Sequence, residues 1–206
     1  MHSEAMSAVE PYEPILICSG VVAAPVEAVR LTVLCELEKT IGRSSISSDL
    51  QRIVWQEFFE DDGLFYDGKR FQIALFSTGK NCTVYVCNLA DGWISLYENM
   101  VRSGRFDAYF FRATFAESFR YKVFEMAVWR HGLLERQLRA LQDDAGWEFL
   151  NRGEPLPFEK VERYRKRQVS GRLDRELIAA YSEAAGYNLA SITKFHEQCW
   201  KFWRNE

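Results

Sequence analysis

Acidic side chains gathered in short segments are the residues whose types and spacing could do chemistry. Glu60-Asp61-Asp62, Asp67 and Asp143-Asp144 lie where breaks in the hydrophobic pattern predict loop tips. Paired carboxylates can act as general acid and base when they are buried and oriented. Turn formation is the simpler explanation, because Asp side chains accept hydrogen bonds from nearby backbone amides. We therefore predict no catalytic residue. If the chain acts by binding a partner protein, we expect a rigid scaffold to present four of these acids to it: Asp61, Asp62, Asp143 and Asp144.

Histidine and cysteine residues provide a weaker signal for a metal site. His196 and Cys199 are three residues apart, but a structural site needs four such ligands, and the other histidines, His2 and His131, fall in a tail and in a predicted hairpin turn. The five cysteines are odd in number and irregularly spaced, as expected for reduced, structural thiols. No glycine-rich segment has nucleotide-binding spacing. We predict neither a metal nor a cofactor.

A basic segment follows in the C-terminal half. Its cations could follow a phosphate backbone, and they are Lys160, Arg163, Arg165, Lys166, Arg167, Arg172 and Arg175. Glu159 and Glu162 are interleaved with them, and an amphipathic surface helix needs a charged face in any case. We favour a solvated helix face and expect no nucleic-acid partner.

Composition and charge narrow the class of protein. With 206 residues, 48% of them hydrophobic, the chain can bury a substantial core, and its net charge of -3 excludes a globally basic nucleic-acid binder. The N-terminus lacks the basic start and apolar core of an export signal. No apolar run approaches the roughly 18 residues that a membrane span needs. We expect a cytoplasmic protein that does not contact a membrane.

The N-terminal half combines short apolar runs with one clear helical pattern. After a loose tail over residues 1–10, residues 15–22 read as a buried strand, and a helix follows from Pro25 until Gly42 ends it. Residues 44–49 are polar and predict a loop, and residues 50–58 suggest a second short helix.

A period of two begins at Phe65. Residues 71–75 and 82–88 predict a β-hairpin, while residues 93–100 fit either a helix or a strand. Ser103-Gly104 is the best candidate boundary, so we divide the chain into an N-terminal lobe over residues 11–104 and a second part over residues 105–206. The two parts could equally form one continuous domain.

The second part has the strongest pattern in the chain. Large apolar residues alternate with charged ones over residues 106–159, with short turns between the runs, which predicts an antiparallel meander. The prolines of residues 154–157 predict an extended connector, followed by helices over residues 158–168 and 172–185. Residues 192–206 fit a helix or a strand. The predicted fold class is α+β: an antiparallel β-meander with an N-terminal strand-helix unit and C-terminal helices.

One segment of this second part resembles known sequences. It comprises residues 141–149, the stretch Gly153-Glu154-Pro155-Leu156-Pro157-Phe158-Glu159, and then Tyr164, Arg172-Leu173, Leu177 and Tyr181. These residues resemble the C-terminal part of poorly characterised bacterial proteins, some of them encoded beside secreted-toxin loci. The resemblance implies a cytosolic, non-enzymatic binding protein, an immunity protein that neutralises a cognate antibacterial effector or toxin by forming a complex with it. It carries over no catalytic residue.

Two other functions stay open. The first is an enzyme whose site is assembled from dispersed carboxylates, which a deep pocket holding two or more loop acids would favour. The second is a nucleic-acid-binding module that uses residues 160–175, which a contiguous basic face with exposed aromatic side chains would favour. A mainly acidic surface would favour the immunity hypothesis, because opposite charge speeds capture of a basic effector.

Overall fold

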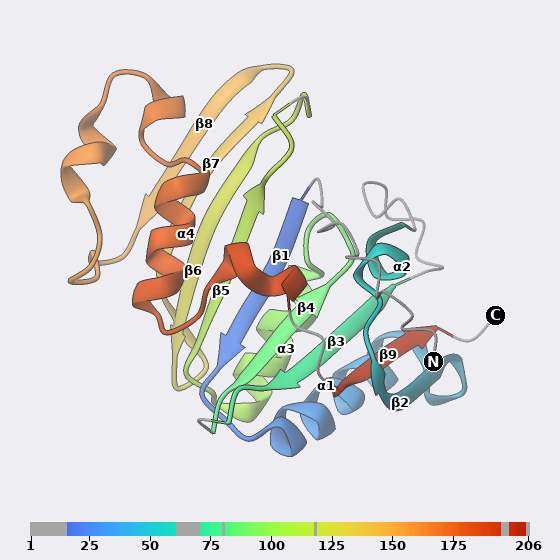
Figure 1. The fold of residues 1–206 in the computed structure, drawn as a ribbon. Coiled ribbons are helices and arrows are strands. Elements are labelled where there is room, and N and C mark those ends of the chain that lie inside the picture. The colour runs from blue at the N-terminus through green and yellow to red at the C-terminus, as the bar shows by residue number, and fades with distance from the viewer. Residues whose placement is uncertain (1–15, 61–70, 80, 118, 195–197, 205–206) are drawn as a thin grey trace, which may run out of the picture.

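A single nine-stranded sheet organises the protein (Figure 1). The computed structural model describes residues 16–60, 71–79, 81–117, 119–194 and 198–204. The strand order is β2-β9-β3-β4-β1-β5-β6-β7-β8, and every neighbouring pair is antiparallel. The strands are β1 (Leu16–Val22), β2 (Ile46–Arg52), β3 (Gln72–Ser77), β4 (Thr83–Cys87), β5 (Ala108–Thr114), β6 (Val123–Arg130), β7 (Leu133–Asp143), β8 (Gly146–Arg152) and β9 (Gln198–Arg204). The predicted α+β class and antiparallel pairing are confirmed.

Helices cover both faces of the sheet. One core contains side chains from α2 (Trp55–Glu60), α4 (Arg175–Ala184) and η4 (Leu189–Lys194), and the other contains side chains from α1 (Val26–Ile41) and α3 (Ile94–Gly104). Figure 1 shows α4 in front of the sheet, and α1 and α3 behind it. Central strands are therefore buried on both faces, and every residue of β4 is buried.

The strand and helix predicted at the start of the chain are confirmed. β1 is an apolar run in which six of seven residues are buried. Pro25 immediately precedes α1, where its fixed φ and missing N–H are tolerated. Gly42 ends the helix with φ of 85°, a conformation that favours glycine.

The loop predicted over residues 44–49 is wrong. Residues 43–45 form the short turn η1, and β2 begins at Ile46 and continues to Arg52, so the helix predicted over residues 50–58 is reduced to α2. β2 has few apolar residues because it is an edge strand with a largely exposed surface. Its pairing with β9, which is distant in sequence, overrides its weak local preference.

The predicted hairpin and meander are confirmed. β3 and β4 pair in register from Ile73 opposite Cys87, and β5, β6, β7 and β8 follow one another in sequence and in space. Residues 94–104, at the end of the N-terminal part, form α3, so the segment whose pattern fitted either a helix or a strand is a helix. Ser103-Gly104 is the end of that helix, and strands from both sides of it share the sheet.

The helix predicted over residues 158–168 is wrong. The segment between β8 and α4 contains only the short 3₁₀ turns η2 (Val161–Arg165) and η3 (Val169–Gly171). Three of its charged side chains shape the segment: Glu159 bonds to Arg136 of the sheet, and Arg163 and Arg172 bond to backbone carbonyls of the segment itself. α4 confirms the next helix, with Asp174 accepting a hydrogen bond from the Leu177 amide as its N-cap. The last described residues form the strand β9.

Candidate functional site

Two connections of the meander lie side by side at one end of the sheet. The end of β7 is joined to the β5–β6 loop by a hydrogen bond of 2.8 Å from the Gln142 amide to the Lys122 carbonyl. We call residues 115–117, 119–122 and 143–146 the meander tip. Lys122 closes the first loop on itself, because its ammonium group donates to the carbonyls of Ala116 and Glu117. The tip therefore presents its exposed side chains from a fixed backbone.

Asp144 lies at the centre of the polar contacts of the tip. Its carboxylate is 2.5 Å from the Arg120 guanidinium, and the Tyr121 hydroxyl donates to both carboxylate oxygens at 3.2 and 3.3 Å. Both charged side chains are about two-thirds or more exposed, at 65% for Asp144 and 75% for Arg120. An exposed pair of this kind contributes only about 0–1 kcal/mol to stability, so a partner could replace either member at little cost.

Of the other three acids predicted to bind a partner, the structure describes only Asp143. Asp143 accepts a hydrogen bond of 2.8 Å from the Ala145 amide, so its carboxylate also shapes the turn. Asp61 and Asp62 lie outside the described residues. The structure thus brings Asp143 and Asp144 together with Arg120 and Tyr121, two residues that the sequence analysis did not single out.

A cavity of about 180 Å³ lies between the β5–β6 loop and the start of α4. The residues that line it are Thr114, Phe115, Ala116, Glu117, Lys122, Phe124, Asp174, Arg175 and Glu176. Two of the lining carboxylates are already paired with arginines: Asp174 with Arg163, and Glu176 with Arg175. Asp143 and Asp144 do not line it, so the cavity does not gather those acids for catalysis.

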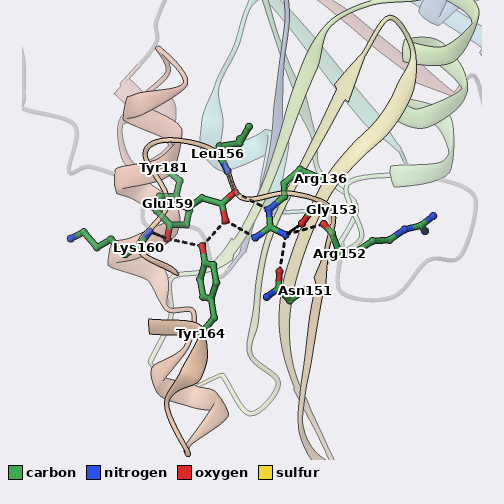
Figure 2. A network of polar contacts seen from close by, with 9 residues as sticks. All are labelled: Arg136, Asn151, Arg152, Gly153, Leu156, Glu159, Lys160, Tyr164 and Tyr181. Carbon is green, nitrogen blue, oxygen red and sulfur yellow. Dashed lines mark hydrogen bonds and ion pairs between the residues drawn. The ribbon is translucent and has the colours of Figure 1, made fainter. Parts of the chain in front are cut away.

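A buried polar network holds the connector after β8 against the sheet (Figure 2). The Arg136 guanidinium is 2.5 Å from the Glu159 carboxylate, and both side chains are at most 1% exposed. Arg136 also donates to Asn151 and to the carbonyls of Arg152 and Gly153. Burial opposes the charge of Arg136, but hydrogen bonding to Glu159 and its negative charge outweigh that effect and raise the pKa of Arg136.

The Glu159 carboxylate also accepts hydrogen bonds from its own connector. Its carboxylate accepts hydrogen bonds from the Leu156 amide at 2.9 Å and the Tyr164 hydroxyl at 2.9 Å. The Tyr181 hydroxyl lies 2.8 Å from that of Tyr164 and accepts from the Lys160 amide. Gly153 has φ of 84°, and a Cβ there would lie 1.9 Å from the Glu135 carbonyl oxygen. The Gly153–Glu159 stretch that carries the resemblance is therefore built for packing in this chain.

Of the five cysteines, the three buried ones, Cys18, Cys87 and Cys199, are poor nucleophiles and poor metal ligands. All five are free; burial raises the pKa of the Cys87 thiol to about 12 and that of Cys199 to about 11. Within the described ranges, no three His, Cys, Asp or Glu side chains gather as metal ligands. His196, the predicted neighbour of Cys199, lies outside those ranges.

Over the part of the chain that the structure describes, no helix combines the length and apolar character that crossing a bilayer requires. No protein-family model, no curated protein and no solved structure matches this chain.

Proposed function

We propose that the protein is a non-enzymatic bacterial immunity protein that acts in the cytoplasm and neutralises a secreted toxin by binding it directly. The observation that carries this proposal is the meander tip. Asp143 and Asp144 lie beside Tyr121, which is 40% exposed, on loops whose backbones are fixed. Acidic side chains next to an exposed aromatic ring suit capture of a basic protein surface.

The ion pair between Arg120 and Asp144 can be replaced by an ion pair between Asp144 and a partner. Arg120 pairs with the Asp144 carboxylate, and its guanidinium lies over the Tyr121 ring at 5.4 Å. An arginine from a toxin could occupy the same place, with its guanidinium paired to Asp144 and stacked on Tyr121. Such a contact would be desolvated in the complex and hence stronger than the exposed pair it replaces.

The two alternative functions have less support. The cavity beside α4 suits an enzyme poorly, because Asp174 and Glu176 are already paired with arginines. A nucleic-acid module would use stacking aromatics, but Tyr164 in the basic segment is buried and bonded to Glu159.

The test is affinity capture from a native lysate of the producing bacterium, followed by a neutralisation assay. We expect the captured protein to inhibit bacterial growth when expressed alone and to be harmless when co-expressed with this chain. A captured protein whose toxicity is unaffected, or failure to capture any toxin, would contradict the proposal and favour an enzyme.

A further inference from the structure

The charge of the chain is distributed unevenly around one short segment. Residues 160–172, which we call the basic segment, contain six lysine or arginine residues and one glutamate, a net charge of +5. The whole chain carries -3, so the remaining residues carry -8. A cation cluster of this density repels itself, and its folded arrangement needs a physical explanation.

Two of its arginines fix the path of the backbone. Arg163 is paired with Asp174 and donates to the Gly171 carbonyl at 3.0 Å. Arg172 donates to the Lys166 carbonyl at 2.7 Å and lies over the Phe149 ring. These contacts replace the hydrogen bonds of a regular helix, so the segment keeps one conformation without being helical.

The buried network ties the start of the segment to the sheet. Tyr164 donates to Glu159, which is paired with Arg136 of β7, and the Lys160 amide donates to Tyr181 of α4 (Figure 2). Figure 1 shows the segment projecting beside β8 and α4 at one side of the molecule. The segment is therefore anchored at both ends and exposed between them.

Four cations are left pointing at solvent. Lys160, Arg165, Lys166 and Arg167 are all exposed, and their side chains have no ion-pair or hydrogen-bond partner among the residues that the structure describes. The Lys166 side chain lies over Gly171, where its Cδ would be 3.3 Å from an added Cβ. Arg163 and Arg172 thus hold the backbone while their neighbours remain available.

We propose that the basic segment is a second docking surface, which binds an acidic segment of a protein through carboxylates. It extends beyond the proposed function, since it does not involve the meander tip. Nucleic acid fits less well for two reasons: Tyr164, the one aromatic residue of the basic segment, is buried against Phe149, and the charge of -8 elsewhere repels a long polyanion. A short acidic segment can pair with the four cations and avoid that repulsion.

The test uses the full chain and two anionic probes at low salt: a short poly-L-glutamate of about ten residues and a duplex DNA of about twenty base pairs. The variant Arg165→Glu/Arg167→Glu is compared with Arg52→Glu/Arg102→Glu, which changes the net charge equally at exposed sites elsewhere. We expect poly-L-glutamate to bind about tenfold or more weakly to the first variant, and almost unchanged to the control. Circular dichroism checks that both variants fold.

Each other outcome overturns the inference. Equal losses in the two variants would mean that only net charge matters, and tighter binding of duplex DNA would assign the surface to nucleic acid. If neither probe binds, the basic segment is only a solvated surface and does not dock an acidic partner. Reversal of Asp143 and Asp144 must leave poly-L-glutamate binding intact, so failure of the tip proposal and failure of this one are distinguishable.

Discussion

Arg136 and Glu159 form the most deeply buried ion pair among the described residues. An isolated buried charge is costly, and a pair is tolerated here because Asn151, Leu156 and Tyr164 satisfy the remaining donors and acceptors. The network therefore positions the connector after β8, and through it the basic segment.

Breaking the buried pair should be far more damaging than breaking the exposed one. We expect Arg136→Met to lower the free energy of unfolding by about 3–5 kcal/mol, because the Glu159 carboxylate is left buried without its cation. Arg120→Met, which breaks the exposed pair with Asp144, should cost less than about 1 kcal/mol. Urea denaturation of both variants makes the comparison. Similar losses would mean that Arg136 is replaceable.

The sequence pattern explains why Arg136 is buried but does not identify its partner. Arg136 shares its strand parity with Leu138 and Ala140, which are buried, so alternation already directs it inward. Its partner Glu159 is 23 residues away on irregular backbone, and the pattern provides no signal for that contact. The same holds for Arg120 and Asp144, which meet only because an antiparallel meander places alternate connections at the same end.

The buried thiols and phenols make stability sensitive to alkaline pH. Burial raises the pKa of Cys87 to about 12, and it raises the pKa of Tyr97 well above its ordinary value. In the unfolded chain, Cys and Tyr side chains have pKa values of about 8.5 and 10. A raised folded-state pKa means that the contribution to stability is complete below the unfolded pKa and decreases as pH rises towards the folded value.

We therefore expect the free energy of unfolding to fall above about pH 9, and to fall less steeply in Cys87→Ala than in the wild type. Urea denaturation over a series of pH values measures both slopes. Equal slopes in the two proteins would show that the Cys87 thiol does not contribute.

At the scale of elements, β9 has the least predictable position. It is the last described strand, yet it lies between β2 and β3. Cys199 and Phe202 are an odd number of residues apart and point to opposite faces, where each enters a different core. Because both faces are covered, the alternation of a half-exposed strand is lost, and spacing by threes and fours could not distinguish strand from helix.

The β9 position makes Phe202 important for the whole edge of the sheet. We expect Phe202→Ala to cost about 3–5 kcal/mol, since the ring is fully buried beneath α1 and its loss leaves a cavity. Leu133→Ala, at a side chain that is 69% exposed, should change stability by less than about 0.5 kcal/mol. Thermal and urea unfolding distinguish the two, and an equally mild effect at Phe202 would contradict the packing of β9.

At the scale of the whole molecule, one sheet joins both halves of the sequence. β1 lies between β4 and β5, and β9 from the end of the chain separates β2 from β3. The sequence indicated the meander because consecutive strands are also neighbours there, but the long-range pairs have no local signature.

A shared sheet should unfold as one unit. We expect tryptophan fluorescence and far-ultraviolet circular dichroism to give coincident urea transitions, because neither half can lose its strands without exposing edges of the other. Two separated transitions would instead show that residues before and after Ser103-Gly104 unfold independently.

If the proposed immunity function is right, the meander tip is the surface that binds a basic toxin. The direct measurement is titration of the captured toxin with the wild type, with Asp143→Ala/Asp144→Ala and with Asp143→Lys/Asp144→Lys, using Asp49→Lys/Glu57→Lys as a control of equal net charge at exposed sites. We predict that tip reversal weakens binding about a hundredfold or more at low salt, more than alanine does, while the control changes it little and higher salt reduces the difference. Unchanged affinity of the tip reversal, in a variant whose unfolding free energy is also unchanged, would contradict the account.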